Sequence, residues 1–154
     1  MRITICGSIA FYKEMQAAKN QLIQLGNEVE MPELEFDITK DLGGGKVIYF
    51  DDYVRENGGM ESFSDDHIIW SIKGRAMKSH FDKIDWADAI LVINHEKEEI
   101  SGYIGGNTLI EMGTAFYLKK RIYILNLVSS ELSYKQEVLG MGPIFLGGDL
   151  NMVK

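Results

Sequence analysis

The chain has 154 residues, a length that suits one domain with a core of its own. Hydrophobic residues make up 45% and charged residues 25%, which is the composition of a soluble globular protein rather than a disordered one. The net charge of −7 argues against a surface for duplex nucleic acid, because such a surface needs a basic face. It leaves open a single nucleotide, whose phosphate can be held by backbone amides.

The cysteine content and the N-terminal sequence predict the cellular compartment of the protein. Cys6 is the only cysteine, so no disulfide can form within the chain, and this favours a reducing cytoplasm. The first residues lack the long apolar core of a signal peptide. No stretch approaches the roughly 20 apolar residues of a membrane span. We therefore expect a cytoplasmic protein without membrane contacts.

Strand and helix patterns alternate in the first half of the chain. Residues 2–6 form a β-branched strand pattern that ends at Gly7, and residues 12–25 carry apolar side chains at helical spacing. Residues 28–31 predict a short second strand. Residues 33–66 are acidic and rich in glycine, without clear periodicity. A segment of this length without a pattern predicts a lid or a mobile excursion.

The second half continues the alternation. Helical spacing returns over residues 67–84, and residues 89–94 form a continuous apolar run, which is typical of a strand buried on both faces. A loop then leads into a helix that contains Glu111. The remaining elements are a buried strand at 121–125, a short helix at 133–141 and a last strand at 144–147.

This order predicts an α/β fold. We expect a flavodoxin-like or Rossmann-like three-layer sandwich, with a parallel sheet of about five strands and helices on both faces. One domain is expected over residues 1–154, with a variable excursion at about 33–66. Ligands of such sheets bind beyond the carboxyl ends of the strands. The polar residues expected at that edge are Ser8, Asn94, His95, Tyr103, Asn107 and Asn126, whereas Asp88 enters a strand at its amino end and is expected to be a structural turn residue.

Several familiar motifs are absent. The "GGGK" at 43–46 has Val47 in place of the Ser or Thr of a Walker loop and lacks a strand–helix frame. The three histidines, His67, His80 and His95, have no ligand spacing with cysteines or carboxylates, so we expect no metal site. No serine has the strand–turn–helix context of a nucleophile elbow. No cofactor is expected.

The "GSIAFY" at 7–12 is the first candidate binding motif, because it follows a strand and opens a helix. The amides around Gly7 and Ser8 could receive a phosphate or a hydroxyl at the helix N-terminus. The alternative is a tight turn with Ser8 as the helix cap. The sequence leaves both interpretations open.

Glu111 is the second candidate. With Asn107 as the expected cap, Glu111 lies in the first turn of its helix or just past it, where the helix dipole favours the ionised carboxylate. An exposed helix-start charge is the alternative interpretation. The helix follows the most buried strand, and Glu111 aligns with the ligand edge of the sheet, which suits a nucleophile.

Two segments carry a family resemblance. The strand "ADAILVIN", followed by a glycine-rich loop and "GGNTLIEMGTAFYLKKRIYILN", resembles the nucleoside 2-deoxyribosyltransferase superfamily. This superfamily includes deoxynucleoside monophosphate N-glycosidases, which open with a comparable "GSI". The resemblance covers residues 1 to about 125, is strongest over 86–126 and fails over 33–66. In the family, a helix glutamate attacks the anomeric carbon of the sugar and forms a glycosyl-enzyme ester. The resemblance assigns this role to Glu111.

Two positions depart from the family pattern. Family transferases commonly have an aspartate six residues before the nucleophile, where this chain has Gly105, with Asn107 as the nearest polar residue. The family also uses a carboxylate eight residues before the aspartate of the strand turn, and here that position is His80. His80 is expected to approach the site and move protons, with His95 as a second candidate. The alternative is that His80 is a partly buried histidine on a helix face.

The expected function is cleavage or exchange of the N-glycosidic bond of a 2′-deoxyribonucleoside or its 5′-monophosphate, through a glutamyl glycosyl-enzyme intermediate. A non-catalytic nucleotide-binding sensor on the same scaffold is the alternative. The expected partner is a small nucleoside or nucleotide, not a nucleic acid polymer, and the resemblance implies a homodimer or higher homo-oligomer. The catalytic candidates are Glu111 and His80, and the substrate-binding candidates are Gly7, Ser8, Asn94, Tyr103, Gly105 and Asn107.

Overall fold

The computed structural model describes all of residues 1–154 and contains a five-stranded sheet in the order β2-β1-β3-β4-β5. Every neighbouring pair of strands is parallel. The winding reverses between β1 and β3, as in flavodoxin-like folds. The α/β fold and the parallel sheet expected from the sequence are therefore confirmed. The strands are β1 (Arg2–Gly7), β2 (Glu28–Glu30), β3 (Ala89–Ile93), β4 (Arg121–Ile124) and β5 (Ile144–Phe145).

Helices alternate with these strands. The predicted elements are confirmed, with shifts at their ends of the kind that fraying produces. Neither α3 nor any shorter helix is long and apolar enough to cross a membrane. The helices are α1 (Tyr12–Gln24), α2 (Phe50–Glu56), α3 (Ile69–Trp86), α4 (Gly106–Tyr117) and α5 (Lys135–Gly140), with short 3-10 turns at η1 (Ile9–Phe11), η2 (Met60–Ser62) and η3 (Leu150–Met152).

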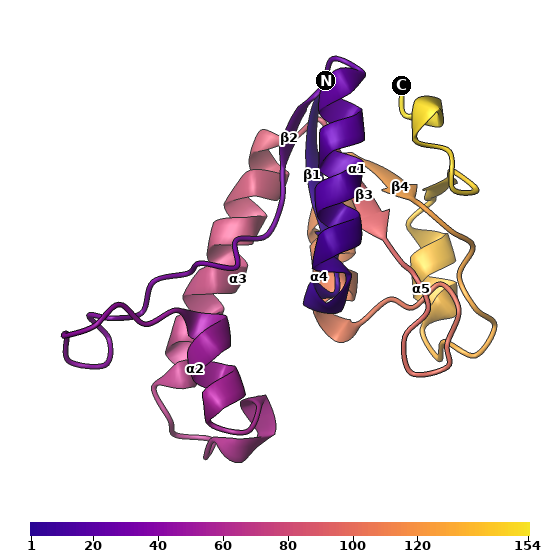
Figure 1. Cartoon of the computed structure of the whole chain (residues 1–154). Coiled ribbons are helices and arrows are strands. Elements are labelled where there is room, and N and C mark those ends of the chain that lie inside the picture. The colour runs from indigo at the N-terminus through magenta and orange to yellow at the C-terminus, as the bar shows by residue number, and fades with distance from the viewer. The chain divides into compact units, whose positions relative to one another are not determined.

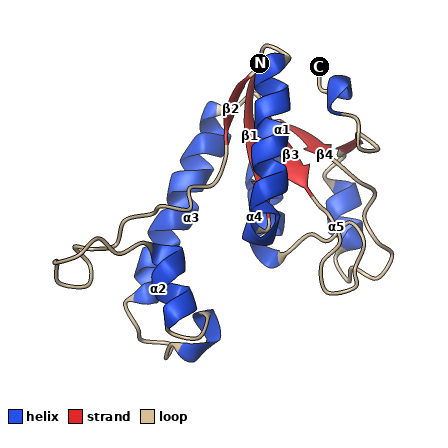
Figure 2. Cartoon of the chain, in the orientation of Figure 1, coloured by secondary structure: helices blue, strands red, loops and turns tan.

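The sheet is covered on both faces, which explains the continuous apolar run of β3. Ala89, Leu91 and Ile93 point to the face that α1 covers, whereas Ile90 and Val92 point to the face that α4 covers. Figures 1 and 2 show α1 and α4 on opposite sides of the strands. The buried apolar residues that the helices add to these two clusters are Met15, Ala18 and Leu22 from α1, Ile84 from α3, Met112 and Ala115 from α4, and Val138 from α5.

The chain divides into two compact units. One comprises residues 1–32 and 81–154 and contains the whole sheet, and the other is Glu33–His80. The second unit has its own apolar cluster around Ile38, Ile69 and Ile72. Figure 2 shows loops joined to short helices in this part of the chain. The segment 33–66, predicted without secondary structure, contains α2, whose short length leaves no readable periodicity and whose apolar side chains pack within this cluster.

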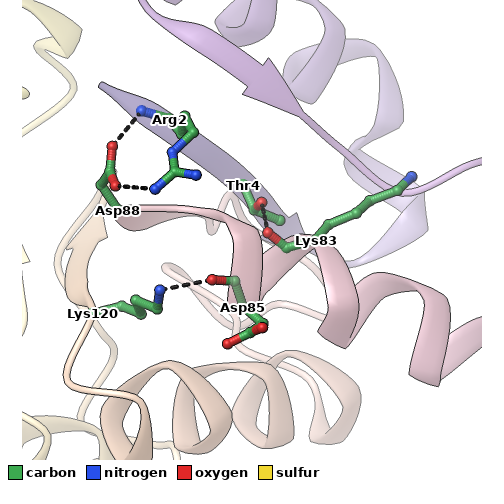
Figure 3. A network of polar contacts seen from close by, with 6 residues as sticks. All are labelled: Arg2, Thr4, Lys83, Asp85, Asp88 and Lys120. Atoms are coloured by element: carbon green, nitrogen blue, oxygen red, sulfur yellow. Dashed lines mark hydrogen bonds and ion pairs between the residues drawn. The ribbon is translucent and has the colours of Figure 1, made fainter.

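Polar contacts secure the amino end of the sheet (Figure 3). The backbone amide and the guanidinium of Arg2 each donate a hydrogen bond of 2.8 Å to the Asp88 carboxylate. This contact lowers the pKa of Asp88 to about 2. The expectation that Asp88 is a structural turn residue is confirmed.

The last turn of α3 is tied to the sheet by side-chain donors (Figure 3). The Thr4 hydroxyl donates to the Lys83 carbonyl at 2.7 Å, and the Lys120 ammonium donates to the Asp85 carbonyl at 2.7 Å. Carbonyls in the last turn of a helix lack intrahelical partners, so these donors stabilise the end of α3.

Candidate functional site

The carboxyl edge of the sheet is built around a close approach of β1 and β3. Gly7 ends β1 and lies opposite Ile93, the last residue of β3. A Cβ at Gly7 would lie only 2.7 Å from the Ile93 carbonyl oxygen, and the φ angle of Gly7 is +153°. Only glycine fits here without a shift of the backbone. Gly7 therefore lets the chain leave β1 immediately beside β3.

Glu111 reaches this edge from α4. It is the sixth residue of the helix, and its exposed fraction is 5%. It shares the buried face of α4 with Thr108, Met112 and Ala115. Glu111 therefore lies just past the first turn of α4, as expected, and the alternative of an exposed helix-start charge is wrong.

The start of α4 also differs from the prediction. Gly105 is the N-cap, and no side chain caps the helix. Asn107 is therefore the second residue of the helix rather than its cap, and it is exposed. The expected capping role of Asn107 is wrong, and its expected contact with substrate stays a prediction.

Burial dominates the electrostatics of Glu111. It raises the pKa of Glu111 to about 8, and hydrogen bonds from the Cys6 thiol and the Gly7 amide oppose the shift. A carboxylate oxygen of Glu111 lies within 4.8 Å of the Cys6 sulfur. The expectation that the helix dipole favours the ionised form is corrected, because desolvation of a buried charge outweighs a helix dipole. A pKa of about 8 means that Glu111 holds its proton in most molecules at neutral pH.

Ser8 follows Gly7 and caps the 3-10 turn η1. Its hydroxyl accepts a hydrogen bond of 3.4 Å from the Ala10 amide. The capping interpretation of "GSIAFY" is confirmed in this respect, although the capped element is a single 3-10 turn that precedes α1. The amide of Gly7 already donates to Glu111. A phosphate contact near Ser8 stays a prediction.

Asn94 has a structural role. Its exposed fraction is 0%, its amide nitrogen donates to the Asn126 carbonyl at 2.9 Å, and its amide oxygen accepts from the Asn126 backbone nitrogen at 2.8 Å. The Asn94 side chain therefore joins the chain just after β3 to the chain just after β4. Both ends of the amide are engaged inside the fold, and the expected contact of Asn94 with substrate stays a prediction.

Tyr103 and Gly105 lie together before α4. A Cβ at Gly105 would lie 3.2 Å from the Tyr103 ring and 3.4 Å from its hydroxyl oxygen. The ammonium of Lys97 lies 5.0 Å from the centre of the same ring. The Tyr134 hydroxyl donates to the Ile104 carbonyl, and burial, followed by the neighbouring Tyr103, raises the pKa of Tyr134. Tyr134 is a neighbour of this group that the sequence did not reveal, because the pattern at 133–141 predicted only a helix and gave no sign of its contact with Ile104.

The histidine candidates differ in their surroundings. The His95 ring packs edge-on against Phe11, with ring centres 5.7 Å apart, and the His95 carbonyl accepts from the Tyr103 amide at 3.0 Å. His80 is buried on α3 and is the last residue of the second unit. The predicted proton transfer by either residue stays a prediction.

Known proteins show what this fold is. No family model and no curated protein matches the chain. Among solved structures it is similar to a 2-deoxyribosyltransferase from Bacillus psychrosaccharolyticus, with a TM-score of 0.50 and 16% identity over 84% of this chain and 77% of that one. A CMP N-glycosidase from Clostridium botulinum has a TM-score of 0.47 and 14% identity over 94% of this chain and 85% of that one. At this identity the first likeness shows the fold, which is the one that the sequence resemblance implies.

Proposed function

We propose that the protein cleaves or exchanges the N-glycosidic bond of a 2′-deoxyribonucleoside or its 5′-monophosphate. The observation that carries this proposal is a buried glutamate beside Gly7 at the carboxyl edge of a parallel sheet. Burying a carboxyl group costs free energy, and carboxyl groups with strongly shifted pKa values cluster at functional sites. The fold of a 2-deoxyribosyltransferase and the sequence resemblance support this class of reaction.

The proposed reaction has two steps with Glu111 as the nucleophile. In the first step, an oxygen of the ionised carboxylate attacks the anomeric carbon, and the bond from that carbon to the base nitrogen breaks. The bonding electrons leave with the base, whose nitrogen takes a proton from an acid that we assign to His80. In the second step, water or another base attacks the same carbon, the ester bond breaks, and Glu111 leaves as a carboxylate. The incoming group then gives its proton to His80.

The other residues of the edge are assigned to binding. We assign the base or the sugar to Asn107, Tyr103 and the backbone at Gly105, which lie at the start of α4. We assign the 5′ end of the substrate to Ser8. By resemblance, the active assembly is a homodimer or a higher homo-oligomer, which the mass measured in solution by light scattering will test.

A substrate panel tests the proposed function. The protein is incubated with deoxynucleosides and their 5′-monophosphates, with and without a second base, and the bases are separated by chromatography. Release or exchange of a base by wild type, and its loss in Glu111→Gln, is expected. A 2-fluoro-2-deoxy-arabinosyl nucleoside is expected to add its sugar mass to wild type and not to the variant. Saturable binding without base release would instead favour the sensor.

A separate substitution tests the 5′ end. Ser8→Asp retains a capping oxygen for the Ala10 amide but adds a negative charge, which repels a phosphate. Affinity for a monophosphate is expected to fall at least about tenfold, with nucleoside affinity nearly unchanged. Isothermal titration with both ligands measures the difference. Equal losses for the two ligands would contradict a phosphate contact at Ser8.

A further inference from the structure

We propose that the end of β1 holds the Glu111 carboxylate with two consecutive donors, the Cys6 thiol and the Gly7 amide, and that Cys6 is a positioning residue for the proposed nucleophile. The catalytic consequence of this inference rests on the proposed function. The contact itself does not, because it can be measured in the protein without any turnover.

The backbone of β1 places the Cys6 thiol at a fixed position. Cys6 has an exposed fraction of 0% and lies opposite Val92 of β3 in the central part of the sheet. Its side chain points to the face that α4 covers, where it joins the cluster of Met112 and Ala115. Its sulfur lies within 4.8 Å of a Glu111 carboxylate oxygen. Strand pairing and helix packing together therefore bring the thiol to the carboxylate.

The acceptors around the thiol differ in strength. The Cys6 sulfur lies 4.0 Å from the Thr4 carbonyl, at the limit of a hydrogen bond to sulfur, and it also hydrogen bonds to Glu111. A thiol is a weak donor, but hydrogen bonds to an ionised acceptor are stronger than those to a neutral carbonyl. The thiol consequently favours the ionised carboxylate, which is the form that attacks the sugar.

Cys6 is suited to donate rather than to react. Burial and the neighbouring charge of Glu111 both raise the pKa of the Cys6 thiol well above its usual value. The thiolate is the nucleophilic form of cysteine, so a thiol that keeps its proton does not compete with Glu111 for the anomeric carbon. The Gly7 amide supplies the second donor and cannot lose its proton at all.

A buried cysteine can also act only as a small apolar residue. The pKa of Glu111 distinguishes a positioning role from a purely apolar one. It is measured by NMR titration of protein labelled with carbon-13 at the glutamate side-chain carboxyl groups. The Glu111 resonance is identified by its absence in Glu111→Gln. The compared proteins are wild type, Cys6→Ala, Cys6→Ser and Val92→Ala. The last is a matched control, because Val92 is the cross-strand partner of Cys6 on the same buried face.

A positioning role predicts that Cys6→Ala raises the pKa of Glu111 by about half a unit to one unit, because a donor to the charged form is lost. Cys6→Ser retains a donor, so the pKa is expected at or below the wild-type value. Val92→Ala removes two methyl groups from the same buried cluster and no donor, so the pKa is expected to stay unchanged. If Cys6→Ala does not fold, Cys6→Val fills the space without a donor and takes its place. Repeating the titrations in a His80→Gln background removes the ionisation of that imidazole from the comparison.

Two results would overturn the proposal: the same Glu111 pKa in wild type and in the variants that lack a donor, or an equal shift in Val92→Ala. If the substrate panel finds turnover, the pKa taken from the rise of kcat/KM with pH is expected to shift in each variant by the same amount as the Glu111 pKa measured by NMR. If it finds none, the proposed function fails while the titration still decides the contact. If the kinetic pKa shifts in a variant while the Glu111 pKa measured by NMR stays constant, the rise of kcat/KM with pH does not report the ionisation of Glu111.

Discussion

At the scale of single residues, two carboxyl groups of this protein show that environment decides their behaviour. Asp88 is exposed and accepts two hydrogen bonds from Arg2, which lower its pKa to about 2. Glu111 is buried in α4, and desolvation raises its pKa to about 8 although two donors stabilise the charge. The first group is ionised throughout the physiological range and secures the fold. The second changes its protonation near neutral pH.

The raised pKa of Glu111 predicts the pH dependence of the reaction. The nucleophile is the ionised form, so kcat/KM is expected to rise about tenfold per pH unit below about pH 8 and to level off above it. Initial rates of base release at low substrate concentration, from about pH 5.5 to 9, measure this limb. A flat profile between about pH 6 and 8 would show that the ionisation of Glu111 does not limit the reaction.

The same shift predicts the effect of Glu111→Gln on stability. In the folded protein Glu111 keeps its proton up to about pH 8, whereas the unfolded chain loses it near 4.5, the ordinary pKa of a glutamate. The unfolded chain therefore binds fewer protons between these two values. The contribution to stability is fully present below about pH 4.5 and is lost as the pH rises towards about 8, with a limiting slope of about 1.4 kcal/mol per pH unit.

Glu111→Gln removes this loss, because the amide does not ionise. The variant is expected to be more stable than wild type at about pH 8, with a smaller difference at about pH 5. Urea unfolding at both values measures the free energy of unfolding. Glu14→Gln is the control, since Glu14 is an exposed glutamate in the first turn of α1. A variant less stable than wild type at about pH 8 would contradict the account of a desolvated carboxyl group.

At the scale of elements, the residues at the carboxyl edge of the sheet are of two kinds. Some hold the edge together, and others are exposed and available to a ligand. Asn94 and Asn107 were both substrate candidates by their position after β3. The structure engages the Asn94 amide with Asn126, which joins the ends of β3 and β4, and exposes Asn107 in the first turn of α4. An asparagine just after β3 therefore holds two loops together, whereas an asparagine at the start of α4 is exposed to solvent.

This division predicts opposite results for two alanine substitutions. Asn94→Ala leaves the amide and carbonyl of Asn126 without their partners at a buried junction, so the free energy of unfolding is expected to fall by about 2–4 kcal/mol. Asn107→Ala is expected to change stability by less than about 0.5 kcal/mol and to raise KM. Denaturant unfolding and steady-state kinetics of both variants measure these effects. An unchanged KM in a stable Asn107→Ala protein would remove Asn107 from the binding residues.

At the scale of the whole molecule, the two compact units differ in the size of their cores. The unit with the sheet contains two buried apolar clusters, one on each face. The unit Glu33–His80 contains one cluster with three fully buried members, Ile38, Ile69 and Ile72. Local opening is easier where fewer apolar side chains are buried. The smaller unit is therefore expected to open locally more readily than the sheet, and the lid proposed for residues 33–66 stays a prediction.

Hydrogen exchange tests this expectation. Amides of α2 and its flanking loops are expected to exchange at least about tenfold faster than amides of β1 and β3, because their cluster is smaller. A bound substrate is expected to slow exchange in residues 33–66. Mass spectrometry of peptides from the exchanged protein, with and without each nucleoside and nucleotide, measures both effects. Exchange in this segment that no ligand changes, together with unchanged limited proteolysis, would contradict a lid.

The sequence by itself determined the alternation of strands and helices and hence the parallel sheet. These features depend on local patterns, such as the apolar run of β3 and the helical spacing of α1, which are legible without knowledge of distant contacts. It also singled out Glu111 as an acid among apolar neighbours. It did not reveal α2, because a helix of seven residues has too few turns for a periodic pattern.

Only the tertiary structure decided what surrounds the candidate residues. Packing buries Glu111 and raises its pKa, and the two donors that oppose this shift, Cys6 and Gly7, are far away in the sequence. The role of Asn94 depends in the same way on Asn126, across the junction of β3 and β4. A pattern of residue types predicts which face of an element is buried. It does not predict the desolvation of the Glu111 carboxyl group or the hydrogen-bond partner of the Asn94 amide, because both arise only when separate elements pack against each other.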